Sequence, residues 1–243
     1  MDSGLYAACA GLVARTEALD IAANNLANVN TTGFRGQQET FREVLAGRST
    51  SYYTPINRAV NSYGILGGSR ADLSQGHLEP TGNDLDCGIE GDGFFRIRTS
   101  AGVLYTRNGN FHVAKGGTLV TAAGDAVLGE QGPIRLPDGV PSISGDGTIS
   151  VNGALAGKFR LVTFAPGTAL QSAGNSYYGA GGAVEQPSQA RTRQGSIESS
   201  NVNPVAAAAG LIALQRHAEM LQRALSMFHS EFNKIAVEDL PKV

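Results

Sequence analysis

The sequence predicts an α+β protein with paired N- and C-terminal helices, coiled-coil-like in their spacing, and a central all-β antiparallel domain. Near the start of the chain leucines recur every seven residues, at Leu5, Leu12, Leu19 and Leu26. Near its end, apolar residues between 211 and 235 alternate steps of three and four without a break. Between these regions the apolar spacing drops to two, in short segments separated by glycine-containing turns.

The first helix is expected over residues 3–29 or 3–30, and Gly33 can take the left-handed conformation that ends it. Its last two turns contain three asparagines: Asn24, Asn25 and Asn28. Asparagine is a poor helix former, because its side chain competes for nearby backbone groups. Two explanations stay open at this point. The asparagines either fray the helix before Gly33 or make directed hydrogen bonds to neighbouring subunits.

The second helix is expected over residues 204–236, with Asn203 as its N-cap and Pro204 in its first turn. It has no charged residue from Pro204 to Gln215, and the first helix has only Asp2, Arg15, Glu17 and Asp20. A helix with only one packed face usually carries a charged outer face. The sparse charge therefore indicates that several faces of both helices are covered in an assembly.

From these patterns we expect one set of residues to pack helices together within and between subunits. The set comprises Leu5, Leu12, Leu19, Asn24, Asn25, Leu26, Asn28, Leu211, Leu214, Leu221, Leu225, Phe228 and Phe232.

The middle of the chain is expected to be a curled antiparallel sheet or a partial barrel. Its predicted strands cover residues 94–98, 103–106, 111–114, 118–121 and 158–164, and "AKGG" between two of them predicts a hairpin turn. The predicted domains are a discontinuous helical domain of residues 1–45 with 195–243, an extended linker of 46–71, and a β-rich domain of 72–194.

Composition excludes several classes of protein. A formal net charge of -2 gives no reason to expect nucleic acid as a partner, and no apolar run reaches the roughly 20 residues of a membrane-spanning helix. The first thirty residues lack the pattern of a cleaved signal peptide, so these features alone predict a cytoplasmic protein. We expect Cys9 and Cys87 to be buried free thiols, with a single bridge between them as the alternative.

The residues also predict that the chain is not an enzyme and holds no metal or cofactor. Its four histidines lie in separate segments, and no G-x-S-x-G nucleophile motif is present. "NDLDCGIEGDG" suggests a calcium loop, but Gly88 stands where an oxygen ligand is needed and Ile89 where glycine is needed.

Four ordered motifs resemble one family. "ANNLANVNTTGF" (23–34) is similar to the N-terminal signature of bacterial flagellar basal-body rod and hook proteins, the axial family, and "GSIESSNVNPVAA" (195–207) resembles the start of its C-terminal helix. "QGHLEPTGNDLDCGIEGDGFFRI" (75–97) and "LYTRNGNFHVAKGGTLVTAAGDAVLGEQGPIRLP" (104–137) resemble its middle-domain motifs. Together these motifs cover most of the chain.

The resemblance implies a structural subunit, most like the proximal-rod members and next the distal-rod members. Subunits of this family polymerise through their terminal helices into a periplasm-spanning tube, through which exported chains pass. The implied partners are other rod and hook axial proteins, further copies of the chain, and the flagellar type III export apparatus. Export by that apparatus needs no cleaved signal peptide, so the resemblance replaces the cytoplasmic prediction with the flagellar basal body.

A hypothesis of another class is a soluble binding module, in which the β-rich middle recognises a ligand and the helices only dimerise it. A simple dimeric coiled coil carries charges at the positions that flank its seam. These helices have few, and the sequence therefore favours the rod subunit.

Overall fold

Two long helices, α1 (Asp2–Ala27) and α3 (Pro204–Glu238), come before and after the strands in the sequence. The computed structural model describes residues 2–45 and 62–238, with the side chains of residues 9, 11–38, 69–227 and 230. The chain divides into two compact units. The terminal unit comprises Met1–Leu26, Gln37–Ser69 and Asn203–Val243, and the β unit comprises Ala27–Gly36 and Arg70–Val202.

The helix boundaries follow from local chemistry. The Asn203 Oδ1 accepts hydrogen bonds from the backbone N–H groups of Val205 and Ala206, both at 3.0 Å, so the predicted N-cap is confirmed. Gly33 has the predicted left-handed conformation, with a φ of 68°, but the prediction that it ends the helix is wrong, because α1 already ends at Ala27, six residues earlier. A β-carbon on Gly33 would collide with the backbone of Arg107 and Asn108, so a second constraint also demands glycine there.

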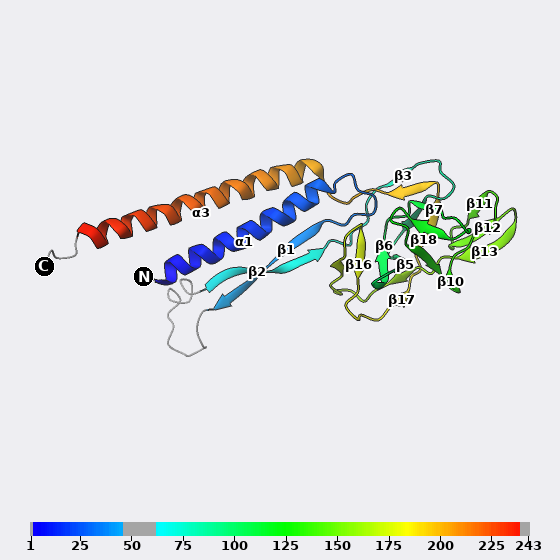
Figure 1. Cartoon of the computed structure of the whole chain (residues 1–243), viewed down its shortest axis with the longest axis horizontal. Coiled ribbons are helices and arrows are strands. Elements are labelled where there is room, and N and C mark those ends of the chain that lie inside the picture. The colour runs from blue at the N-terminus through cyan, green and yellow to red at the C-terminus, as the bar shows by residue number, and fades with distance from the viewer. Residues whose placement is uncertain (1, 46–61, 239–243) are drawn as a thin grey trace. The chain divides into compact units, whose positions relative to one another are not determined.

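The prediction of a paired, coiled-coil-like arrangement of the helices is wrong. Although α1 and α3 run in opposite directions within the terminal unit (Figure 1), the buried apolar side chains among their described residues are the alanines Ala14, Ala18 and Ala218. A coiled coil buries its heptad leucines as knobs in the facing helix. Here every described leucine of the predicted seam is only partly buried: Leu12, Leu19, Leu26, Leu211, Leu214, Leu221 and Leu225. The class itself remains α+β.

The terminal unit also contains a two-stranded sheet of β1 (Gln37–Leu45) and β2 (Ser62–Ala71). The predicted linker of residues 46–71 therefore includes a strand at its end, and residues 46–61 lie outside the described residues. "SYGILGGSRA" combines glycine and serine with few apolar residues, so its sequence gave no alternating signal. Residues 27–36 and 195–202, assigned to the helical domain from the sequence, belong to the β unit.

The β unit is built from short strands. The largest sheet has the order β15-β16-β6-β5-β9-β8-β7, and β10 pairs with β9. Its strands are β5 (Phe95–Thr99), β6 (Gly102–Thr106), β7 (Phe111–Val113), β8 (Leu119–Thr121), β9 (Ala126–Gly129), β10 (Gly132–Pro133), β15 (Gln171–Ser172) and β16 (Tyr177–Gly179). All of its pairs are antiparallel.

Four smaller antiparallel sheets complete the β unit: β11-β12-β13, β14-β17, β18-β4 and β19-β3. Their strands are β3 (Leu78–Pro80), β4 (Cys87–Glu90), β11 (Pro141–Ile143), β12 (Thr148–Val151), β13 (Ala154–Lys158), β14 (Val162–Thr163), β17 (Gln186–Pro187), β18 (Arg191–Gln194) and β19 (Ser196–Glu198).

Four predicted strands match β5, β6, β7 and β8 to within a residue at each end. The predicted "AKGG" hairpin is confirmed, because Gly116 and Gly117 have φ values of 100° and 80° in the turn between β7 and β8. The predicted strand over 158–164 is wrong. The structure instead ends β13 at Lys158 and begins β14 at Val162, because the two strands pair in different sheets.

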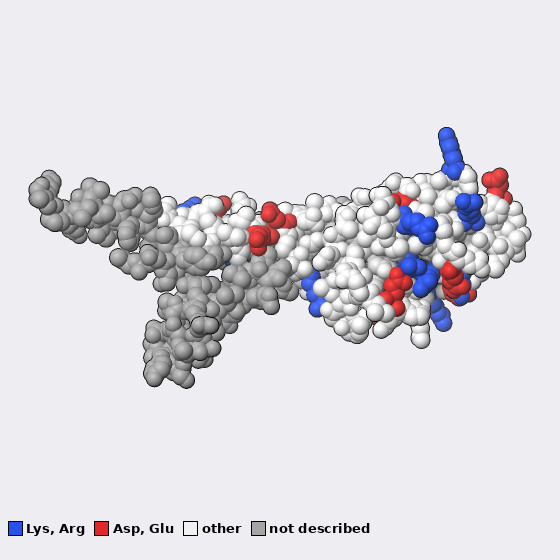
Figure 2. Space-filling model, turned by 60° about the horizontal axis from the view of Figure 1, so that its bottom comes forward, with Lys and Arg blue, Asp and Glu red and all other residues white. Residues whose placement is uncertain are grey.

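Aromatic side chains hold the β unit together in two buried clusters. In the first, the ring of Phe95 packs edge-on against Phe111 and Phe159, with centroids 5.0 and 5.1 Å apart. In the second, Phe94 and Tyr105 both pack against Phe164. Outside these clusters, basic and acidic side chains are interspersed over the face of the β unit in Figure 2.

Both cysteines are free, but only one matches its prediction. Cys87 is fully buried in the first aromatic cluster, as expected. Cys9 is exposed on α1, so its predicted burial is wrong. Burial raises the pKa of the Cys87 thiol from 9.0 to about 12.

We predict that the free energy of unfolding of the full chain falls as pH rises from about 9 to about 12. The buried Cys87 thiol keeps its proton over this range, whereas the thiol of the unfolded chain loses it, so alkali favours unfolding. Cys87→Ala should make this slope shallower by up to about 1.4 kcal/mol per pH unit. The measurement is urea unfolding at several pH values, followed by far-ultraviolet circular dichroism. The matched control is Cys9→Ala, and equal slopes for the wild type and Cys87→Ala would contradict the prediction.

Candidate functional site

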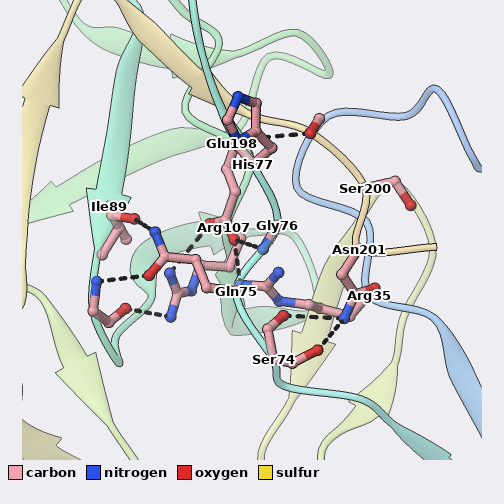
Figure 3. Close-up of polar contacts among 12 residues, drawn as sticks. Arg35, Ser74, Gln75, Gly76, His77, Ile89, Arg107, Glu198, Ser200 and Asn201 are labelled. Atoms are coloured by element: carbon pink, nitrogen blue, oxygen red, sulfur yellow. Dashed lines mark hydrogen bonds and ion pairs between the residues drawn. The ribbon is translucent and has the colours of Figure 1, made fainter. Parts of the chain in front are cut away.

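A buried ion triad joins three segments of the β unit. The Glu198 carboxylate lies at its centre, with Oε1 2.6 Å from Nη2 of Arg35 and Oε2 3.1 Å from Nη1 of Arg107 (Figure 3). All three side chains are almost fully excluded from solvent. Arg35 lies in the segment that follows α1, and Glu198 ends β19, just before the segment that leads to α3.

Glu198 also bonds to the backbone of the segment that contains Arg35 and to the backbone of one further segment. Its Oε1 accepts a hydrogen bond from the N–H of Gly76 at 2.7 Å, and its main-chain oxygen accepts one from the N–H of Gly33 at 2.7 Å. A buried carboxylate needs such partners, because its transfer from water is costly unless it is paired and hydrogen-bonded. One residue thus fixes the loop after α1, the loop before β3 and the side chain of Arg107.

Arg107 has a partner on each side of its guanidinium group. Its Nη2 donates to the main-chain oxygen of Gly91 at 2.7 Å, and its Cζ lies 5.3 Å from the centroid of the Phe94 ring. Burial lowers the pKa of Arg107 from 12.5 to about 10, and the charge of Glu198 opposes this decrease. The side chain therefore stays protonated at neutral pH.

The segment after α1 is fixed by two more polar contacts. The N–H of Arg35 donates to the hydroxyl of Tyr178 at 2.9 Å, and burial raises the pKa of that phenol, which keeps it neutral. The N–H of Gly36 donates to Oδ1 of Asn201 at 2.8 Å. The Asn201 amide nitrogen in turn donates to the main-chain oxygens of Asp72 and Ser74, at 2.9 and 3.0 Å (Figure 3).

The predicted packing residues belong to the terminal unit, except Asn28, which belongs to the β unit, and none of them is a member of the triad. The side chains of Leu5, Phe228 and Phe232 lie outside the described residues. Asn24 is exposed, and Asn28 is half-buried and accepts a hydrogen bond from Oγ1 of Thr31 at 3.1 Å.

Asn25 makes a two-bond contact with the first residue of β1. Its Nδ2 donates to the main-chain oxygen of Gln37 at 2.8 Å, and its Oδ1 accepts from the Gln37 N–H at 2.7 Å. The amide side chain thus bonds both the N–H and the C=O of Gln37, as the backbone of a neighbouring strand would. This contact within the chain explains why a helix tolerates asparagine at this position, and the sequence did not indicate it. The predicted role of Asn25 in contacts between subunits stays a prediction.

In the acidic loop that resembles a calcium site, the carboxylate oxygens of Asp86 already accept hydrogen bonds from protein side chains. Asp86 is buried, its Oδ1 accepts from the amides of Asn83 and Asn110, and its Oδ2 accepts from Thr81. Across the described residues, no group of three or more His, Cys, Asp or Glu side chains could hold a metal ion. Neither helix, over its described length, is both long and apolar enough to cross a membrane.

Sequence reasoning missed the triad. A signal for it was present, because each of its residues stands inside or next to a motif with few other charges: "NTTGFR", "LYTRNGN" and "GSIESSN". A lone charge within such a motif is a candidate for burial with a partner. The pairing itself was not visible, since Arg35 and Glu198 are separated by more than half of the chain.

Fold and triad together define an α+β protein in which a β unit, inserted in the sequence between two terminal helices, contains the segments that lead to both of them. Comparison with known proteins gives the family. Residues 5–35 match the family described as flagella basal body rod protein, residues 88–151 match the flagellar hook protein FlgE/F/G D1 domain, and residues 193–235 match the flagellar basal body rod FlgEFG protein C-terminal.

Individual relatives match over most of their length. The chain is 35% identical over 222 residues to the flagellar basal-body rod protein FlgF of Mesorhizobium japonicum, covering 89% of each chain. It is 32% identical over 255 residues to FlgF of Caulobacter vibrioides, covering all of both chains. It is also 35% identical over 237 residues to the flagellar basal-body rod protein FlgG of Bacillus subtilis, covering 87% of this chain and 89% of the relative.

The chain belongs to the family of flagellar basal-body rod proteins, structural components of the flagellar basal body. Each of the three matched segments contributes one residue of the triad: Arg35, Arg107 and Glu198.

We predict that Glu198→Gln lowers the free energy of unfolding by about 3–5 kcal/mol, because it leaves two buried guanidinium groups without their carboxylate. Glutamine keeps the shape of the side chain, so the change isolates the charge. Urea unfolding of the full chain, followed by tyrosine fluorescence, measures it.

The matched control is Glu130→Gln. Glu130 is a largely exposed carboxylate 3.9 Å from Lys158, so its loss should cost less than about 1 kcal/mol. Equal and small effects of both substitutions would show that the triad does not hold the β unit together.

Proposed function

We propose that this chain is a structural subunit of the proximal rod of the bacterial flagellum. It polymerises through its terminal helices into the axial tube, which transmits torque and gives passage to exported subunits. The observation that carries the proposal is the match to FlgF proteins over the whole chain, at 32% identity to that of Caulobacter vibrioides.

The helices provide the surface for polymerisation. Their seam leucines are only partly buried within the chain, and α3 has no charge from Pro204 to Gln215. Such surfaces gain free energy when a neighbouring subunit removes them from water. The predicted packing residues, from Leu12 on α1 to Leu225 on α3, are therefore proposed contacts of the assembled rod.

The proposed partners are further copies of the chain and other rod and hook axial proteins. The flagellar type III export apparatus is a third proposed partner, because a rod subunit has to cross the inner membrane before it assembles.

A distal-rod subunit is the second candidate. The match to FlgG of Bacillus subtilis favours it, since the identity of 35% is as high as that to FlgF of Mesorhizobium japonicum. Copy number separates the two candidates. Quantitative mass spectrometry of purified basal bodies, normalised to the hook subunit, should find a few copies of a proximal-rod subunit and several-fold more of a distal-rod subunit. Absence of the chain from the particle would contradict both.

We predict that Leu221→Asp prevents incorporation into basal bodies. Leu221 is half-buried in the predicted seam of α3, and an unpaired carboxylate there would cost several kcal/mol on docking. The same mass spectrometry measures incorporation in a strain that carries only the variant gene.

Gln222→Asp is the matched control, because it introduces the same charge at the next, exposed position. Normal incorporation of both variants would argue against polymerisation through this face of α3, and failure of both would mean that any added charge on α3 is harmful.

A further inference from the structure

Helix α3 has apolar side chains on two opposite faces. One face contains the half-buried leucines from Leu211 to Leu225 and the buried Ala218. On the opposite face, Val205, Ile212, Met220 and Met227 are 78%, 53%, 56% and 61% exposed. With about 3.6 residues per turn, these four residues form one line along the helix. A helix face that contacted only water would have polar and charged residues instead of these four apolar ones.

This second face is a continuous stripe. Between Val205 and Met227 the residues at steps of three and four are all exposed, and they form what we call the outer stripe: Val205, Ala209, Ile212, Arg216, Met220, Arg223 and Met227. Such spacing is that of a helix that packs against another helix. Within the described chain the outer stripe remains exposed along its whole length.

The outer stripe carries a net positive charge. Arg216 and Arg223 lie within it, seven residues or about 10.5 Å apart along the axis. Glu219 stands beside them, and its Oε1 accepts a hydrogen bond from Gln215. A partner that covers the stripe therefore needs both apolar and acidic groups.

An exposed face of α1 has this chemistry. Val13 is 59% exposed, and Glu17 and Asp20 are exposed beside it, one and two turns further along the helix. Ala14 and Ala18, by contrast, are buried. Over this face, α1 thus presents an apolar residue with two carboxylates and no basic side chain.

We propose that the outer stripe of α3 binds the exposed face of α1 that carries Val13, Glu17 and Asp20 in a second copy of this chain. The inference rests on the proposed function, and it identifies which helix faces meet between subunits. Glu17 and Asp20 are three residues or about 4.5 Å apart along α1, so both fit between Arg216 and Arg223. Both faces are exposed in the same chain, so a partner has to supply the complement.

Because the two faces differ, the contact is heterologous. Each subunit offers one face to the subunit before it and the other to the subunit after it, and such contacts continue along an open assembly instead of closing a dimer. A paired charge contact also suppresses wrong registers, since a shift along the axis would bring Arg216 or Arg223 opposite apolar side chains.

Charge reversal tests the contact. Three variants of the full chain are expressed in a strain that lacks the wild-type gene: Arg216→Glu with Arg223→Glu, Glu17→Arg with Asp20→Arg, and all four changes together. Arg98→Glu, at an exposed position of β5, is the control for added negative charge. Basal-body content is measured by mass spectrometry, and circular dichroism of each purified chain checks that its helices form.

Each two-residue reversal should abolish incorporation, and the four-residue variant should restore it together with swimming. Normal incorporation of the two-residue variants, or failure of the four-residue variant to restore assembly while its helices form, would overturn the contact. In both cases the wild-type chain would still be found in the basal body, so the proposed function would stand. Absence of the wild-type chain from the basal body would overturn the proposed function, and this contact with it.

Discussion

The buried carboxylate of Glu198 is the constraint on which the rest of the β unit depends. It pairs with Arg35 and Arg107 and accepts a backbone hydrogen bond from Gly76, while its own carbonyl accepts one from Gly33. Replacing a buried ion cluster by apolar side chains is often neutral for stability, whereas removing one member is costly. The triad therefore joins three segments of the β unit through one carboxylate, and the loss of that carboxylate is the costly change.

That arrangement has a direct consequence for a rod subunit. The segment that follows α1 and the segment that leads to α3 are both fixed within the β unit, through Arg35 and Glu198 and through the contact of Asn201 with Gly36. Both segments therefore belong to a β unit with a packed aromatic core rather than to a loose loop. A structural protein that transmits torque needs connections of this kind, and a binding module dimerised by its helices does not.

Periodic and local signals predicted much of the fold. The N-cap at Asn203 and the hairpin at "AKGG" each depend on a few neighbouring residues, and these residues fix the local backbone. The prediction of coiled-coil-like pairing was wrong, because leucines at heptad spacing indicate that one side of a helix is packed but do not identify what packs against it. Alanines fill the buried positions of these helices instead.

Long-range polar contacts were beyond sequence reasoning. Asn25 is an unusual residue for a helix, but its partner Gln37 lies beyond the end of the helix, in a strand whose sequence does not alternate between apolar and polar residues. Arg35, Arg107 and Glu198 are brought together only by the folded β unit, so the few charges around each residue indicate burial but do not identify its partner. Family resemblance supplied the function, because a surface that acts by packing contains no reactive group for a motif to identify.

Native-state hydrogen exchange of the full chain tests the central role of Glu198 most directly. The amides of Gly33 and Gly76 both donate to Glu198, and the amide of Leu119 donates to Ile134 in the aromatic core. If the triad holds the β unit together, Gly33 and Gly76 exchange only through the opening that also exposes Leu119, with the same free energy. Exchange of Gly33 and Gly76 through a separate opening of much lower free energy would contradict this account.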